Sequence, residues 1–273
     1  MIKRHLKAAS AWLAATWPVR SVVANLIYPS LIGCLKGEFQ ADTPSPSGLA
    51  EQIAWKSHAY LVLNEELAPG GQDCSWDGMR CDHETRSRII DKTLDHLDDV
   101  DGDILEFGVY NGESLLTFAE RCPTRRIFGF DSFEGLPQAW WTRPAGTFKN
   151  TIPIPERPNL TLVPGLFDES LPGFLKGWTG RAALVHIDCD LYQSTLSCLL
   201  AILPRCQVGA VLLFDEYWNY PEFARHEWLA WRQVRNRYGI VAACIAYDGR
   251  RAAFQITSLN APQTSGPDLR TSY

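Results

Sequence analysis

The feature that most constrains the fold is a regular alternation of strand-length apolar runs and helix-length segments after residue 102. Parallel strands need long crossover connections, so this alternation predicts a parallel sheet covered by helices on both faces. The predicted strands are 103–107, 126–130, 160–163, 182–187, 210–214, 240–247 and 251–256. The predicted helices that accompany them are 112–121, 168–176, 192–203 and 222–237.

The last two predicted strands are joined in a different way from the others. The short stretch 247–250 connects them and contains an Asp-Gly turn. Because such a short connection forms a hairpin, one of the two strands must run antiparallel to the rest. The sequence therefore predicts an α/β, Rossmann-like fold with a seven-stranded, mostly parallel sheet, a C-terminal antiparallel hairpin and helices on both faces.

The rest of the chain divides around this α/β domain, which we place at 101–258. A Pro- and Ser-rich stretch ends an N-terminal helical extension and linker, residues 1–48. Residues 49–100 read as a helical lid or N-terminal segment, and residues 259–273 as a mobile tail. The basic, apolar start of the extension favours a helix packed on the body or on a partner, while a membrane-surface helix and a signal peptide stay open.

Composition narrows the classes of function and partner. A formal net charge of −5 argues against a nucleic-acid-binding protein, which needs a basic face. Eight cysteines occur without a CxxC pair, so we expect reduced thiols in a cytoplasmic protein rather than a zinc site. Cys74 and Cys81 share a loop-like segment, where pairing or metal binding stays open. We also expect a homo-oligomer and, through the N-terminus, at most a weak membrane-surface contact.

Two predicted strands end abruptly on acidic residues. Asp188 follows strand 182–187, and Asp215 and Glu216 follow strand 210–214, with one helix-length segment between them. Parallel sheets bind ligands at the carboxyl edge of their strands, so these carboxylates should converge there. Converging carboxylates repel one another unless a cation lies among them, and a hard divalent cation is the natural candidate. Ordinary helix capping is the alternative.

A glycine-containing turn follows the first predicted strand. Gly108 permits a tight turn and Gly112 a close backbone approach, in the spacing Gly-x-x-x-Gly rather than the Gly-x-Gly-x-x-Gly that wraps a pyrophosphate. Asp131 ends the second strand, where an acid typically accepts ribose hydroxyls. A ligand with a ribose but no diphosphate fits S-adenosylmethionine, whose amino group would be reached from the side of Glu106.

Five ordered motifs between about residues 75 and 256 carry a resemblance to a known family. They are 105–114 (LEFGVYNGES), 130–137 (FDSFEGLP), 165–172 (GLFDESLP), 186–195 (HIDCDLYQST) and 214–217 (FDEY). The first resembles motif I of class I S-adenosylmethionine-dependent methyltransferases, and the set resembles the macrocin O-methyltransferase (TylF/MycF) family. The resemblance implies a methyltransferase domain over 101–258 that methylates sugar hydroxyls of natural products.

The resemblance also implies a set of site residues. Asp188, Asp215 and Glu216 would ligate Mg²⁺ beside the sulfonium of the cofactor, near Tyr110. The expected cofactor-binding residues are Glu106, Gly108, Tyr110, Gly112, Asp131, Ser132, Phe133, Phe167 and Asp188. The acceptor would be a small-molecule vicinal diol on a sugar, and a phenolic diol, a cell-surface glycan or a non-catalytic binding protein are the alternatives.

The general base is not defined by the pattern. Related catechol enzymes carry a lysine three residues after the first metal aspartate, where this chain has Leu191. The candidates are Asp188, Asp190 and His226, and Asp190 alternatively caps the helix that follows it. Residues 137–158 are long for a βα loop and contain Trp140, Trp141 and Arg143, so they form either a lid over the acceptor or a loop packed on the body.

Overall fold

The structure, a computed structural model, describes residues 55–59, 61–67, 82–150 and 152–259. They belong to two compact units, the first with 55–67 and 219–221 and the second with 82–218 and 222–259. The first contains helical residues 55–59 and the π-helix η2, Leu63–Leu67, where the sequence predicts a helix. The predictions for 1–48, for the tail beyond 259 and for Cys74 and Cys81 lie outside the described residues.

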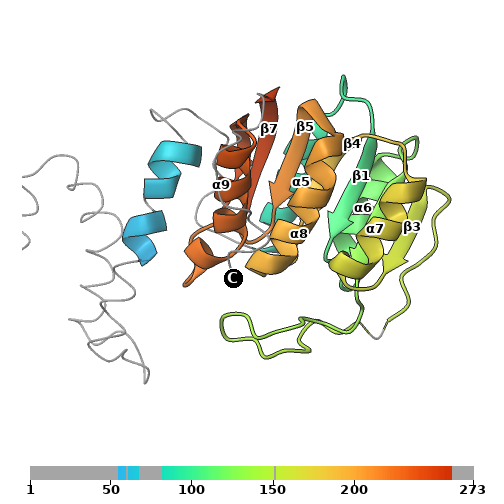
Figure 1. The fold of residues 1–273 in the computed structure, drawn as a ribbon, viewed down its shortest axis with the longest axis horizontal. Helices are drawn as coiled ribbons and strands as arrows, with labels where there is room; N and C mark the ends of the chain where they lie inside the picture. Colours follow the sequence, from blue (N-terminus) through green and yellow to red (C-terminus); the bar gives the residue numbers. More distant parts are fainter. Residues whose placement is uncertain (1–54, 60, 68–81, 151, 260–273) are drawn as a thin grey trace, which may run out of the picture. The chain divides into compact units, whose positions relative to one another are not determined.

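The second unit contains a seven-stranded sheet in the order β3-β2-β1-β4-β5-β7-β6 (Figure 1). Its strands are β1 Asp103–Phe107, β2 Ile127–Asp131, β3 Leu160–Pro164, β4 Ala182–Ile187, β5 Cys206–Phe214, β6 Ile240–Tyr247 and β7 Ala252–Leu259. β1 to β5 pair in parallel, and β7 is antiparallel to both β5 and β6. The predicted sheet with its C-terminal hairpin is confirmed.

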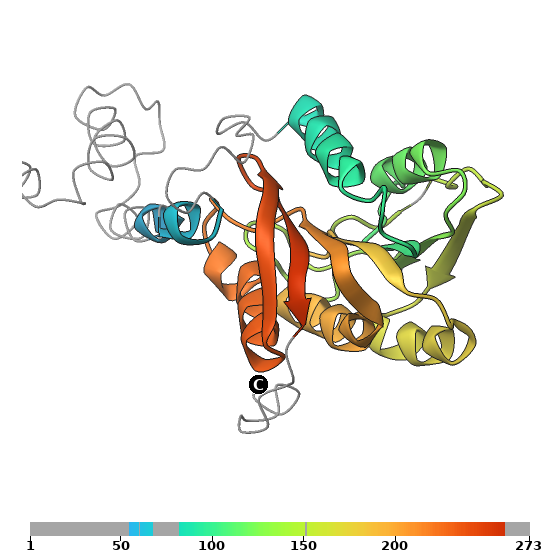
Figure 2. The ribbon, with the colours of Figure 1, turned by 90° about the horizontal axis from the view of Figure 1, so that it is seen from above.

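Helices cover both faces of this sheet. Figure 2 shows α5 (His83–Asp95) and α6 (Glu113–Arg121) on one face. The opposite face carries α7 Phe167–Gly177, α8 Tyr192–Ile202 and α9 Glu227–Arg237. The 3₁₀ turn η4, Leu203–Arg205, follows α8, and the 3₁₀ turn η5, Phe223–Arg225, precedes α9. The sequence predicts that the last helix begins at residue 222, but α9 begins at Glu227. Glu222 has a left-handed backbone and precedes the short turn η5, so the α-helix cannot start there.

The central strands are buried along their whole length. Every residue of β1 and of β4 is buried, as expected for parallel strands with helices on both faces. On the side of α5 and α6, Ile89, Phe118, Ile104 and Leu184 belong to one apolar cluster. Burying each such side chain contributes about 1.5–3 kcal/mol. This packing fixes the sheet edge from which the polar residues project.

The strand register aligns the ends of the central strands. Phe107, Ile187 and Phe214 are successive neighbours across β1, β4 and β5, so the residues that follow them emerge side by side. Phe214 is also paired with Ala252 of antiparallel β7, which brings the residue before Ala252 to the same edge. The register thus gathers Gly108, Asp188, Asp215 and Arg251.

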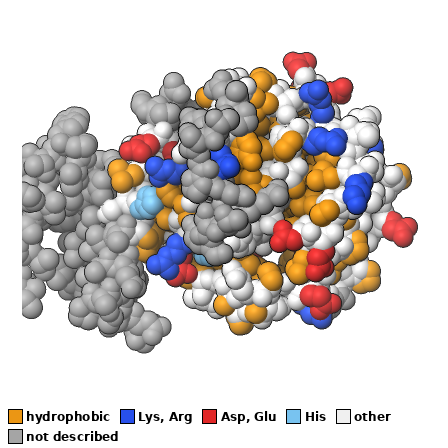
Figure 3. Space-filling view, in the orientation of Figure 1, with side chains coloured by type: hydrophobic (Ala, Val, Ile, Leu, Met, Phe, Trp, Pro, Cys, Tyr) orange, Lys and Arg blue, Asp and Glu red, His pale blue; other side chains and the backbone are white. Residues whose placement is uncertain are grey.

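The described residues contain no helix long and apolar enough to cross a membrane. Acidic and basic side chains both occur on the face of the second unit seen in Figure 3.

Candidate functional site

A cavity of about 370 Å³ opens at this carboxyl edge. Motif I, the end of β2, the loop after β3 and the ends of β4 and β5 all contribute to its wall. The predicted site residues that line it are Gly108, Tyr110, Asp131, Ser132, Phe167, Asp188, Asp190, Asp215 and Glu216. The volume is within the range of small-molecule sites. One cavity therefore unites the predicted cofactor loop with the predicted acid cluster.

Gly108 is required by the close packing of motif I against the end of β4. Its φ is +91°, and a Cβ built there would lie 1.8 Å from the backbone oxygen of Asp188. Its N–H donates to the carbonyl of Phe130 at 2.9 Å. The first glycine of the motif thus lets three strand ends meet at one point.

Asp131 joins two loops of the cavity wall. Its Oδ2 accepts the N–H groups of Val109 at 2.8 Å and Tyr110 at 2.9 Å, and its Oδ1 accepts the N–H of Phe133 at 2.7 Å. These bonds hold motif I next to the loop after β2, with the carboxylate at the cavity. Its position is that expected for an acceptor of ribose hydroxyls.

Glu106 lies behind the cavity wall and is not one of the lining residues. It is fully buried, and its Oε1 accepts hydrogen bonds from Ser114 Oγ and from His186 Nδ1, the latter at 3.0 Å. Its Oε2 has no hydrogen-bond partner among the described residues. Burial is the largest influence on the pKa of His186 and lowers it, but the hydrogen bond to Glu106 and the charges of Glu106, Asp188 and Asp215 together raise the pKa above its ordinary value. The two side chains form a buried pair beneath the site.

Aromatic side chains lie along the part of the cavity wall next to motif I. Phe167 packs edge-on against Phe107 with ring centroids 5.3 Å apart, and Tyr110 packs against Phe148 at 5.6 Å. Gly112 and Phe133, predicted as cofactor-binding residues, are not among the lining residues of the cavity. Phe148 belongs to the long loop after β2, so that loop forms part of the wall.

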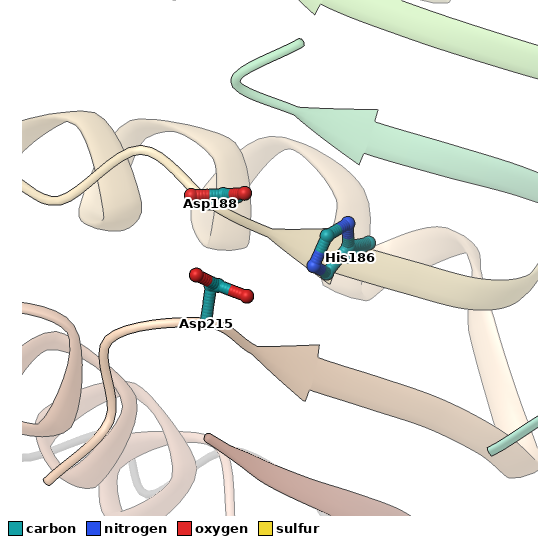
Figure 4. A group of neighbouring side chains, drawn as sticks. All are labelled: His186, Asp188 and Asp215. Carbon is teal, nitrogen blue, oxygen red and sulfur yellow. The ribbon is translucent and has the colours of Figure 1, made fainter. Parts of the chain in front are cut away.

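Asp188 and Asp215 face each other at the ends of β4 and β5 (Figure 4). Possible ligand atoms of His186, Asp188 and Asp215 all lie within 4.8 Å of one another. Burial, and next the charge of Asp215, raise the pKa of Asp188 to about 6, against the opposing effect of Arg86. For Asp215, burial acts upward, but Arg251 and Arg86 outweigh it and hold its pKa below the ordinary value. Asp215 therefore keeps its charge more firmly than Asp188.

Arginines already neutralise much of this acid cluster. Arg86 Nη2 donates to Asp188 Oδ2 at 3.1 Å and to Asp215 Oδ2 at 2.6 Å. Arg251 Nε donates to Asp215 Oδ1 at 2.6 Å, and Arg250 Nη1 donates to Glu216 Oε1 at 3.1 Å. The three predicted metal ligands thus lie at one edge, each beside a guanidinium.

The acids still fit a hard cation. Carboxylate oxygens are the donors that Mg²⁺ prefers, and Asp188 is partly exposed to the cavity. Glu216 is buried, and its Oε2 has no hydrogen-bond partner in the described part of the chain. Burial, and next the charge of Asp215, raise the pKa of Glu216 well above its ordinary value. A cation near this oxygen would satisfy an otherwise costly buried group.

Of the three candidate bases, Asp188 and Asp190 line the cavity and His226 does not. Asp190 lines the cavity with Asp188, and its backbone has a φ of +61°. The prediction that Asp190 caps the next helix is wrong, because Leu191 is the N-cap of α8 and no side chain caps it. His226 is not a lining residue, and its Nδ1 is buried without a hydrogen-bond partner among the described residues.

Sequence reasoning missed Arg86, Arg250, Arg251 and Glu227. Glu227, at the start of α9, is fully buried and accepts the N–H groups of Cys189 at 3.3 Å, Asp190 at 3.1 Å and Glu216 at 3.0 Å. It ties together the turns that carry the acid cluster. Nothing local distinguishes Glu227 or Arg86, whereas the hairpin position of Arg250 and Arg251 could have placed them opposite the end of β5.

The long loop after β2 is partly packed on the body. Trp140 is buried and pairs with Arg143 through an isolated antiparallel bridge, while Leu136, Pro137 and Phe148 line the cavity. The five described cysteines, Cys122, Cys189, Cys198, Cys206 and Cys244, are free.

Comparison with known proteins agrees with this arrangement. Residues 105–217 match the family described as "Methyltransferase domain". The chain is 30% identical, over 89% of its length and 92% of the relative, to 8-demethyl-8-(2,3-dimethoxy-alpha-L-rhamnosyl)-tetracenomycin-C 4'-O-methyltransferase of Streptomyces olivaceus. It is 28% identical, over 60% of its length and 72% of the relative, to demethyldecarbamoylnovobiocin O-methyltransferase of Streptomyces niveus.

The fold is also found among solved structures. The crystal structure of the calicheamicin methyltransferase CalS11 superposes with a TM-score of 0.55 at 23% identity, over 78% of this chain and 94% of that one. The predicted fold and methyltransferase class are confirmed, while the narrower assignment to the macrocin branch stays a prediction. On its sequence relatives and its fold, the chain belongs to the family of S-adenosylmethionine-dependent O-methyltransferases.

Proposed function

We propose that this protein transfers the methyl group of S-adenosylmethionine to a hydroxyl of a vicinal diol on a sugar of a small-molecule natural product, with Mg²⁺ at the acid cluster. The observation that carries this proposal is the single cavity shared by motif I and by Asp188, Asp215 and Glu216. The relative that acts on a rhamnosyl tetracenomycin supports a sugar acceptor.

The residues of the cavity divide between cofactor and acceptor. Asp131 would hold the ribose, while Tyr110 and Phe167 would border the cofactor near its sulfonium. Asp188, Asp215 and Glu216 would hold Mg²⁺, which lowers the pKa of a hydroxyl placed beside it. The chain itself supplies the orientation of the two substrates, from which much of the rate acceleration of a methyl transfer can come.

The departing proton needs an acceptor within the cavity. Asp188 and Asp190 both line it, and Asp190 is free of a helix-capping role. We therefore place the proton acceptor among these two aspartates rather than at His226. Arg250 and Phe148, which also line the cavity, would border the acceptor sugar.

The test is a methyl-transfer assay by mass spectrometry with rhamnosylated and other glycosylated polyketides, with and without Mg²⁺. Calorimetry measures the binding of S-adenosylmethionine separately. We expect Asp188→Asn to lose at least about 100-fold in activity, with the exposed control Asp98→Asn unchanged. Failure to bind S-adenosylmethionine would overturn the function, and full activity after removal of divalent ions would overturn its metal requirement.

A further inference from the structure

Arg86 is attached to the acid cluster in a different way from Arg251. Both side-chain hydrogen bonds that Arg86 makes to described residues come from one nitrogen, Nη2. Arg251 instead uses Nε for Asp215 and Nη1 for Asp248, and its side chain is 7% exposed against 25% for Arg86. Arg86 is therefore the more readily exchanged of the two cations that hold Asp215.

The position of Nη2 conflicts with a metal ion bound to the same two acids. Magnesium lies about 2.0–2.1 Å from its oxygen ligands. Nη2 of Arg86 lies 3.1 Å from Oδ2 of Asp188 and 2.6 Å from Oδ2 of Asp215, so it occupies oxygens that would hold such an ion. Two cations that close repel strongly in a partly buried site. One of them must leave before the other binds.

The backbone of Arg86 can stay in place during such an exchange. Its N–H donates to the carbonyl of Asp82 at 3.0 Å. Asp82 caps α5, since its side chain accepts the N–H of Thr85 and the Thr85 hydroxyl accepts the N–H of Asp82. Because this capping box fixes the first turn of the helix, only the Arg86 side chain needs to move.

We propose that Arg86 and Mg²⁺ compete for Asp188 and Asp215, so that Arg86 is an internal cation that holds the two aspartates together until the metal replaces it. This inference rests on the metal requirement in the proposed function. It adds that metal affinity is set by an arginine on α5, 102 residues before Asp188 in the sequence. Glu216, whose Oε2 has no hydrogen-bond partner among the described residues, would remain available to the incoming ion.

The experiment is calorimetric titration of the full-length protein with MgCl₂ and MnCl₂. We expect Arg86→Met to bind either ion at least about tenfold more tightly than the wild type, because the competing charge is gone. Asp188 then loses its guanidinium, while Asp215 keeps its ion pair with Arg251. Arg88→Met is the matched control, since Arg88 lies on the same helix and pairs with exposed Glu84. It should bind the ions like the wild type. Mg²⁺ should also raise the melting temperature of Arg86→Met more than that of the wild type.

A second measurement uses the wild-type protein and so does not depend on the folding of Arg86→Met. Mg²⁺ should shift the ¹⁵N–¹H signal of the Arg86 Nε–H group, which is identified by its loss in Arg86→Lys. Metal binding that leaves this signal unmoved, or an equal or weaker affinity in Arg86→Met, would overturn the competition and leave the proposed function standing. If neither protein binds Mg²⁺ or Mn²⁺, the competition and the metal requirement both fail, while methyl transfer itself is judged by the activity assay.

Discussion

Arg251 donates a hydrogen bond from Nε to Oδ1 of Asp215 at 2.6 Å, and both side chains are buried. A second nitrogen of Arg251 donates to Asp248 at 2.7 Å. The antiparallel register of β7 on β5 brings Arg251 opposite Asp215. The C-terminal hairpin thus contributes a fixed charge to the site as well as two strands to the sheet.

Arg251→Met should therefore strongly destabilise the fold. The substitution leaves Asp215 without one of its two arginines and leaves buried Asp248 without its ion pair. Removing one partner of a buried pair costs about 3–5 kcal/mol. Urea unfolding gives the free energy. Arg225→Met, which breaks an exposed pair with Glu222, is the control and should change stability little. Equal losses in the two variants would contradict this role of Arg251.

Gly108→Ala should damage both stability and cofactor binding. The new Cβ would collide with the backbone of Asp188, and the positive φ of Gly108 strains any other residue. We expect a loss of more than about 1 kcal/mol, because alanine does not fit this conformation, together with weaker calorimetric binding of S-adenosylmethionine. Gly173→Ala on α7 is the matched control, since its Cβ would meet nothing within 4 Å. If Gly108→Ala bound the cofactor as well as Gly173→Ala does, the required close approach would be refuted.

Glu227→Gln should loosen the turns that carry the acids. Glu227 accepts three backbone N–H groups through both oxygens, and a glutamine amide would direct a donor at one of them. An unsatisfied buried donor costs about 1–3 kcal/mol. Thermal unfolding and methyl transfer should both show a loss. Glu156→Gln, in an exposed loop, should change neither. A Glu227→Gln protein as stable as this control would disprove the tether.

His226 should contribute to the pH dependence of stability rather than to catalysis. Burial is the main cause that lowers the pKa of His226 below its ordinary 6.5, with Arg225 adding to it and Glu222 opposing it. The unfolded chain then binds the proton more readily, so stability falls as the pH drops below 6.5 towards the lowered value. Well above pH 6.5 His226 is neutral in both states and has no such effect.

Replacing His226 by glutamine tests both parts of this expectation. Urea unfolding at about pH 7.5 and about pH 5.5 should show a smaller acid-induced loss in His226→Gln than in the wild type. Methyl transfer by His226→Gln should stay within about threefold of the wild type, because His226 does not line the cavity. A collapse of activity with stability intact would restore His226 as the general base.

The sequence by itself determined the architecture and the edge at which the site lies. The period of the apolar runs predicts strands and helices, and the Asp-Gly turn at 248–249 predicts the hairpin, because these signals are local. The same local reasoning placed Asp131, Asp188 and Asp215 at strand ends, where the structure finds them at one cavity. Strand order and the carboxyl-edge rule for parallel sheets account for that success.

Only the tertiary structure decided which charges meet there. Arg86 is far from Asp188 and Asp215 in sequence. Glu227, at the start of α9, accepts backbone N–H groups from the turns after β4 and after β5. Glu106 pairs with His186 behind the cavity wall, and its predicted contact with the cofactor stays a prediction. Such pairings depend on which helix covers which strand and on side-chain direction, which no local pattern encodes. The positions of the acidic residues could therefore be predicted from the sequence, while those of the arginines that neutralise them could not.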